Sequence, residues 1–263
     1  MQESVTYFVN AMKILLKISY IGTNYCGYQV QPNGISIQQR LNEAAQALFG
    51  FECDVVGCSR TDSGVHANEF CATVAKKGTN ALITGISIEK IPLAFSAHLP
   101  RDICVFDAAW VSDDFHARYD VKEKEYIYRF YNRSVRDPFE EDRACHVPKP
   151  LEDADVIRMQ QAAQLLVGTH DFAAYMAQGS KVESTVRTIY RAEILKEGSV
   201  ICFRVSANGF LYNMVRILAG TLLAVGQGKL EPSDIEHITK KKDRSLAGST
   251  MPACGLYLNR VVY

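Results

Sequence analysis

A short glycine-bounded segment in the first quarter of the chain holds the densest group of reactive side chains. Its sequence is Gly57-Cys58-Ser59-Arg60-Thr61-Asp62-Ser63-Gly64-Val65-His66-Ala67. Because Arg60 stands two residues before Asp62, one loop can place a cation beside the carboxylate and keep it ionised. An ionised carboxylate can serve as a nucleophile or a general base. The alternative is that Asp62 before Ser63-Gly64 simply forms an Asx turn.

Other common catalytic and metal-binding patterns are absent from the sequence. The eight cysteines are scattered, and no Cys-x-x-Cys, His-x-x-x-His or His-Glu-x-x-His spacing supplies zinc ligands. No glycine-rich phosphate-binding loop occurs either. Because no export signal precedes the cysteines, we interpret them as reduced thiols of a cytoplasmic protein. We therefore expect no metal site.

Composition narrows the class of protein without identifying its partner. The 263 residues are 48% hydrophobic and 22% charged, with 29 basic and 29 acidic side chains, which is typical of a folded soluble protein. No apolar run approaches the roughly 18 residues of a transmembrane helix. A net charge of zero argues against a large non-specific cationic surface but leaves an RNA partner open, since local clustering of charge decides such binding.

The elements that must position this loop follow from hydrophobic periodicity. In the first half, alternation predicts strands over 14–20, 70–76, 103–111 and 126–131. Between the first two, Ser36 and Gln39 form a capping-box pattern ahead of a helix that ends at Gly50. The first half is therefore predicted to mix strands with a helix.

The second half repeats this arrangement. Helical spacing appears over 156–167 and 214–225, and a short helix is capped by Ser233; strands over 186–195 and 201–207 flank a hairpin turn. Sequential strand pairs mixed with helices indicate an α+β fold with a largely antiparallel sheet. The irregular, charged stretch 132–150 is the expected connection, which divides the chain into 1–131, carrying the Asp62 loop, and 132–263.

The loop and several other segments together resemble the tRNA pseudouridine synthase A family. The family's catalytic motif is roughly G-x-G/S-R-T-D-x-G-V-H-A, which residues 57–67 follow closely. Further matches stand in family order from about residue 13 onwards, at 20–31, 115–128, 168–172, 185–189, 208–216 and 252–258. Two positions depart from the pattern: Ile21 replaces the usual acid, and Tyr28 the usual Trp. Residues 1–11 fall outside the match, as an irregular arm or as sequence upstream of a start at Met12.

This resemblance implies a fold and an activity. The fold would be two RNA-recognition-like α/β halves, with mainly antiparallel sheets joined edge to edge around a central catalytic cleft. The activity would be isomerisation of uridine to pseudouridine at positions 38, 39 and 40 of the tRNA anticodon stem-loop by a homodimer. Since no electrons or groups enter or leave, the reaction needs no cofactor or metal.

The resemblance also assigns roles to particular residues. Asp62 would be the essential carboxylate, which either attacks the ribose C1′ or removes a proton from C2′. Because a base inside a stem must leave the stack to be reached, Arg60 would enter the vacated space. Tyr126 would stack on the flipped uracil. The alternative, a core aromatic on an alternating strand, fits Tyr128 equally well, and only the resemblance favours the functional role of Tyr126. Arg216 would pair with Asp62 and hold it anionic.

Several other side chains receive a simpler interpretation. His66 and His170 are expected to be structural, while Arg118 and Lys124 are candidates for phosphate contacts that carry no sequence information. Two other classes of function stay open at this point. A non-catalytic RNA-binding protein would not need Arg60, Asp62, Tyr126 and Arg216 together, and a nucleoside hydrolase or glycosidase would need a second well-placed acid.

Overall fold

The computed structural model describes residues 12–179 and 182–263, so the expected arm before Met12 lies outside the described residues. The chain forms ten strands and five α-helices within these ranges. In chain order they are β1 (Met12–Tyr20), α1 (Ile37–Phe49), β2 (Cys53–Gly57), β3 (His66–Lys76), α2 (Ile91–Ser96), β4 (Ile103–Ser112), β5 (Glu123–Asn132), β6 (Cys145–Val147), α3 (Asp153–Gln164), β7 (Gly168–Asp171), β8 (Val186–Glu197), β9 (Val200–Ala207), α4 (Met214–Gly226), α5 (Asp234–Lys241) and β10 (Leu256–Val262).

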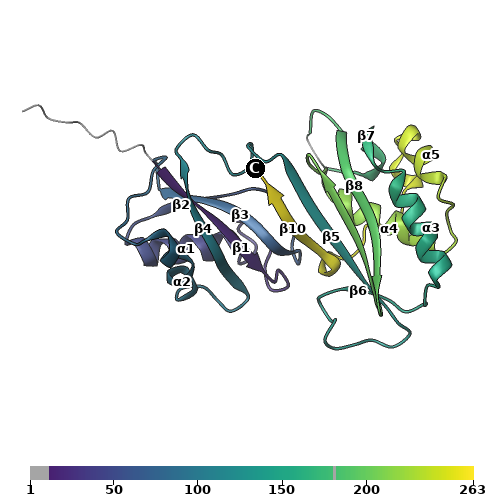
Figure 1. Cartoon of the computed structure of the whole chain (residues 1–263), viewed down its shortest axis with the longest axis horizontal. Coiled ribbons are helices and arrows are strands. Elements are labelled where there is room, and N and C mark those ends of the chain that lie inside the picture. The colour runs from purple at the N-terminus through teal and green to yellow at the C-terminus, as the bar shows by residue number, and fades with distance from the viewer. Residues whose placement is uncertain (1–11, 180–181) are drawn as a thin grey trace, which may run out of the picture.

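One sheet runs the length of the molecule (Figure 1). Its strand order is β4-β1-β3-β10-β5-β9-β8-β7, with β2 added beside β3 and β6 beside β5. All pairings are antiparallel except β10 with β3 and β6 with β5. Helices α1 and α2 lie at one end of this sheet and α3, α4 and α5 at the other. The predicted α+β class with a mainly antiparallel sheet is confirmed.

The C-terminal strand β10 joins the two ends of the sheet. It pairs antiparallel with β5 along most of its length, from Leu256 opposite Tyr128 to Val262 opposite Glu123. On its other side it pairs with β3 in parallel, through Tyr257 opposite His66 and Leu258 opposite Ala67. Because β10 forms hydrogen bonds on both sides, segments from the beginning and end of the chain share one backbone framework.

Local sequence accounts for the helices that flank the sheet. The Ser36 side chain accepts a hydrogen bond from the Gln39 backbone at 3.1 Å, which satisfies an otherwise unpaired donor at the start of α1. Gly50 ends the helix in the left-handed conformation, at φ 77°. In contrast, α4 is buried along most of its length, so its position depends on packing against the sheet and helix α3.

The predicted elements are found with small shifts of their ends, and the structure adds β2, β6, β7, β10 and α2 to them. Strand β5 forms the end of the predicted unit 1–131 and extends one residue beyond it, to Asn132. It pairs with β9 and with β10. The division at 131/132 stays a prediction. Within the described ranges, no helix has the length and apolar character needed to cross a membrane.

Candidate active site

The loop that carries Asp62 connects β2 to β3 and is fixed by the segment that follows β1. The Tyr20 hydroxyl lies 2.8 Å from the Thr61 hydroxyl, and both groups are buried. The Tyr28 amide donates to the Thr61 carbonyl at 3.1 Å, and the Ser63 hydroxyl donates to the Tyr25 carbonyl at 3.1 Å. Because these bonds hold the residues on both sides of Asp62, the position of the carboxylate is set by the fold.

His66, at the end of the loop, is a structural residue. Its Nδ1 accepts from the Gly22 amide at 3.0 Å, so the proton sits on Nε2, which donates to the Cys254 carbonyl at 3.1 Å. The side chain is fully buried, and burial lowers the pKa of His66 below its ordinary value. His66 thus ties the loop to the chain ahead of β10, in agreement with its expected structural role.

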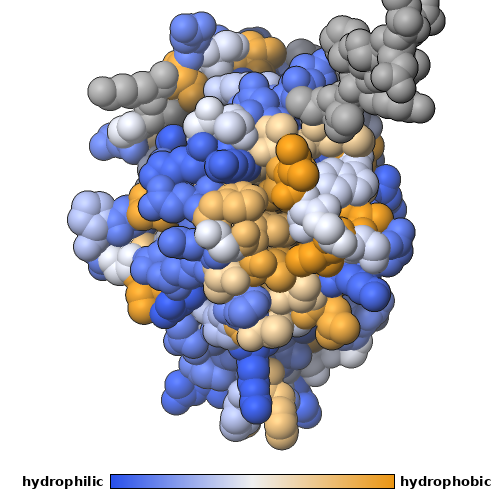
Figure 2. All heavy atoms as spheres, turned by 90° about the vertical axis from the view of Figure 1, so that its left-hand side faces the viewer, coloured by the Kyte–Doolittle hydropathy of each residue, from blue (hydrophilic) through white to orange (hydrophobic). Residues whose placement is uncertain are grey.

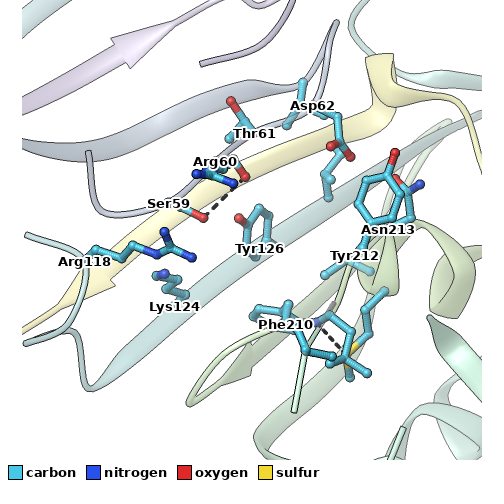
Figure 3. A pocket seen from close by; sticks show the side chains of 16 residues that line it. Ser59, Arg60, Thr61, Asp62, Arg118, Lys124, Tyr126, Phe210, Tyr212 and Asn213 are labelled. Carbon is cyan, nitrogen blue, oxygen red and sulfur yellow. Dashed lines mark hydrogen bonds between the residues drawn. The ribbon is translucent and has the colours of Figure 1, made fainter. Parts of the chain in front are cut away.

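Asp62 lies at the edge of a cavity of about 440 Å³ between the two ends of the sheet (Figure 3). Parts of the chain far apart in the sequence line it: the loop, strand β5 with the residues before it, the segment that leads into α4, and single residues at Val182 and at Leu256 of β10. The cavity lies in the size range typical of small-molecule sites. Its lining includes Ser59, Arg60, Thr61, Asp62, Arg118, Lys124, Tyr126, Phe210, Leu211, Tyr212, Asn213, Met214 and Leu256.

Arg216 forms an ion pair with Asp62, as the family resemblance implies. Its Nη1 lies 3.5 Å from Oδ2 of Asp62, and the arginine side chain is only 17% exposed. The guanidinium is oriented by two further bonds, since Nε donates to the Met251 carbonyl at 2.7 Å and Nη1 donates to Oδ1 of Asn213 at 2.8 Å. Arg216 stands in the first turn of α4, so the buried helix determines where the cation lies.

Two opposing effects act on the Asp62 carboxyl. Burial raises its pKa, and the Arg216 guanidinium lowers it through charge and hydrogen bonding; burial is the larger effect, so the pKa lies above its ordinary value. The expectation that an arginine favours the anion is therefore correct in direction, but the cation does not fully offset desolvation. The ionised fraction of Asp62 is consequently sensitive to the presence of Arg216.

Tyr126 supplies an aromatic surface in the cavity. Its side chain is 7% exposed, and its ring meets the edge of Phe210 at a centroid distance of 5.1 Å and an interplanar angle of 84°. Burial raises the pKa of the Tyr126 hydroxyl, which keeps it protonated at neutral pH. By contrast, Tyr128 is fully buried and donates to the Pro252 carbonyl at 2.7 Å, so it is a core residue.

The other cations of the cavity lie on the far side of Tyr126 from Asp62 (Figure 3). Arg118 and Lys124 approach one another there, and burial, together with the charge of Arg118, lowers the pKa of Lys124. Arg60 also lines the cavity but is exposed, and among the described residues the ion-pair partner of Asp62 is Arg216. Two arginines that the sequence places in one site therefore have different surroundings.

The structure adds residues that sequence reasoning had not selected. Phe210, Tyr212 and Asn213 reach the cavity from the segment before α4, inside the stretch 208–216 from which only Arg216 was chosen. The available signal was the group of aromatic and amide side chains just ahead of an apolar helix. Within residues 12–179 and 182–263, no group of three or more His, Cys, Asp or Glu side chains is placed to hold a metal ion.

Comparison with known proteins gives a consistent assignment. The family model described as tRNA pseudouridine synthase matches residues 162–263. Among curated relatives, "tRNA pseudouridine synthase A" of Thermoanaerobacter sp. (strain X514) is 44% identical over 95% of this chain and 99% of that protein. The protein of the same name from Ruminiclostridium cellulolyticum is 46% identical over the same shares.

A more distant relative of that name, from Halalkalibacterium halodurans, is 41% identical over 94% of this chain and 91% of that protein. Among solved structures, "Crystal Structure of a Cbf5-Nop10-Gar1 Complex" covers 93% of this chain and 48% of the other at a TM-score of 0.36 and 14% identity, a likeness too weak to carry an argument. The similarity to curated relatives extends over nearly the whole chain. The chain therefore belongs to the tRNA pseudouridine synthase A family of isomerases.

Proposed function

We propose that this protein isomerises uridine to pseudouridine at positions 38, 39 and 40 of the tRNA anticodon stem-loop, in the cytoplasm. The observation that carries the proposal is the cavity in which the Asp62 carboxylate, paired with Arg216, lies near the buried ring of Tyr126. One ionisable carboxylate and one aromatic surface are what an isomerisation of a flipped nucleotide requires. Exposed cations around the cavity suit an RNA backbone.

Asp62 is the nucleophile or base of this reaction. Its carboxylate either attacks C1′ of the ribose or removes the C2′ proton to leave a glycal; both routes break the bond between C1′ and N1 of uracil. The uracil then turns and its C5 bonds to C1′; on the first route this displaces the Asp62 carboxylate from C1′, and on the second it is accompanied by return of a proton to C2′. The proton on C5 is released and N1 takes up a proton. Arg216 favours the anionic form of Asp62 that begins either route.

Tyr126 and Arg60 act on the flipped base. The Tyr126 ring can stack on uracil, and its backing by Phe210 keeps the ring in one orientation while the base turns. Arg60 is exposed at the mouth of the cavity, where a cationic side chain can occupy the space that the base leaves in the stem. In this scheme, conversion of a uridine that is base-paired in the stem depends on Arg60 much more than conversion of an unpaired uridine does.

The decisive experiment follows tritium release from C5-labelled uridine in tRNA, with Asp62→Asn as the variant. The wild type should release tritium and form pseudouridine, while Asp62→Asn should lose turnover and keep tRNA affinity, because the lost charge serves bond making rather than phosphate contact. A variant that keeps even a tenth of the wild-type rate, a loss of only about 1.4 kcal/mol, would contradict the assignment. Release of free uracil would instead indicate a hydrolase, and binding without either product an RNA-binding protein.

We further propose that the protein acts as a homodimer. The end of the molecule that carries α1 and α2 shows an apolar patch bordered by polar residues (Figure 2). At this end of the molecule Leu93 of α2 is 77% exposed, and Phe106 of the edge strand β4 is 46% exposed. Apolar patches of this kind typically mark contact surfaces. Light scattering should give the mass of two chains, and Leu93→Glu should shift it toward one; a wild-type monomer would contradict the proposal.

A further inference from the structure

A second hollow, of about 200 Å³, adjoins the catalytic cavity. The two share Ser59, Arg60 and Arg118 as lining residues, so they are separated by one wall that carries two cations. The rest of the lining of the second hollow includes His116 and Tyr119 of the turn 116–120, and Gln29. The reaction at Asp62, as described above, makes no use of this space.

Tyr119 forms an aromatic platform on the rim of the second hollow. Its side chain is 73% exposed, so it contributes little to the core. It is nevertheless held in place, because its ring lies against His116 at a centroid distance of 4.2 Å and the Arg118 guanidinium lies 5.8 Å from its centroid. An exposed aromatic ring beside cations is the arrangement on which proteins stack nucleobases.

The turn beneath the platform is closed by its own hydrogen bonds. The His116 amide donates to the Asp120 carboxylate at 2.8 Å, and Nδ1 of His116 accepts from the Arg118 and Tyr119 amides at 3.1 and 3.3 Å. This network orients the backbone of the turn without burying the Tyr119 ring. The ring is thus available for a ligand in a defined position.

We propose that the second hollow binds the nucleotide next to the target uridine on the same RNA strand. Its base stacks on Tyr119, and the phosphate that links it to the target lies at the shared wall, beside Arg118. Consecutive nucleotides fit because the two hollows adjoin at that wall and because the wall carries Arg60 and Arg118, cations of the kind that contact linking phosphates. The inference rests on the proposed function, since it takes the target uridine to occupy the cavity of Asp62.

Affinity of anticodon stem-loop RNA tests the subsite without any need for turnover. Fluorescence anisotropy would compare intact RNA with two RNAs that carry an abasic site on either side of the target, using wild type, Tyr119→Ala and Tyr119→Phe. Tyr190→Ala is the matched control, because this tyrosine is 49% exposed on β8 and lines neither hollow. Thermal unfolding of each variant confirms that it is folded.

Tyr119→Ala should bind intact RNA at least about fivefold more weakly, as expected when one stacked base is lost. Tyr119→Phe and Tyr190→Ala should bind as the wild type does. The defect of Tyr119→Ala should vanish with one of the two abasic RNAs, because the stacking partner is then already missing. An equal defect on all three RNAs, or no defect, would overturn the subsite.

Pseudouridine formation in the same intact RNA separates this proposal from the proposed function. If the wild type forms pseudouridine but the Tyr119→Ala defect is the same on intact and abasic RNAs, the subsite is refuted and the proposed function stands. If the Tyr119→Ala defect vanishes with one abasic RNA but the wild type forms no pseudouridine, the proposed function is refuted. The second hollow then still binds a nucleotide.

Discussion

Replacing Arg216 by alanine should move the acid side of the pH–rate profile to higher pH. In the proposed mechanism the reactive form of Asp62 is the carboxylate, so activity should rise as the pH passes upward through the pKa of Asp62. Burial already holds that pKa above its ordinary value, and Arg216 opposes burial. Removing the cation therefore raises the pKa further, and the loss of activity is greatest at low pH and disappears at high pH.

The expected size of the effect follows from the geometry of the pair. Unit charges 3.5 Å apart attract by about 1 kcal/mol in water and by about 5 kcal/mol at an effective dielectric constant of about 20. Because the Asp62 side chain is 37% exposed, solvent screening places this pair near the lower value. About 1 kcal/mol corresponds to roughly a fivefold smaller ionised fraction on the acid side of the titration.

Single-turnover conversion of tRNA across pH measures this shift. Arg216→Ala also loses the bonds to Met251 and Asn213, but a merely structural defect lowers the rate by the same factor at every pH. Arg216→Lys is the matched control, since it keeps the charge and should restore much of the wild-type acid side. An acid side that does not move in Arg216→Ala would refute the argument that this arginine sets the charge of Asp62.

Three further outcomes are expected. Arg60→Ala should convert a paired stem uridine far more slowly than the same uridine opposite a mismatch, because unstacking costs a few kcal/mol only in the paired substrate. Single-turnover assays measure both rates, and equal losses on the two substrates would show that Arg60 has another role. Gly22→Ala should lower the free energy of unfolding in urea by about 1–3 kcal/mol, since the added Cβ would lie 1.9 Å from the Val65 carbonyl oxygen. The control Gly85→Ala, whose Cβ would meet nothing within 4 Å, should leave stability unchanged. Dialysis against EDTA should leave activity unchanged because the isomerisation exchanges neither electrons nor groups, and a requirement for added zinc would contradict our interpretation of the cysteines.

The sequence by itself determined the local elements and singled out the carboxylate that we propose as the reactive group. Alternating apolar residues specify β1 and β5, and Ser36 with Gly50 specifies both ends of α1, because these signals depend only on nearby residues. The segment around Asp62 carries its own motif, and its resemblance to a family was visible before any contact was known. Family membership therefore needed no coordinates.

Only the tertiary structure decided how these pieces meet. The sequence of β10 does not encode which strands lie on either side of it, since a strand's partners depend on the edges that the rest of the chain leaves unpaired. Its insertion between β3 and β5 joins the two ends of the sheet, and the packing of α4 then brings Arg216 to Asp62. Spacing along the chain places Arg60 near Asp62, whereas only the family resemblance pointed to Arg216 as the partner of that carboxylate. The fold brings Arg216 to within 3.5 Å of Asp62, because proximity in space is set by packing over long sequence separations.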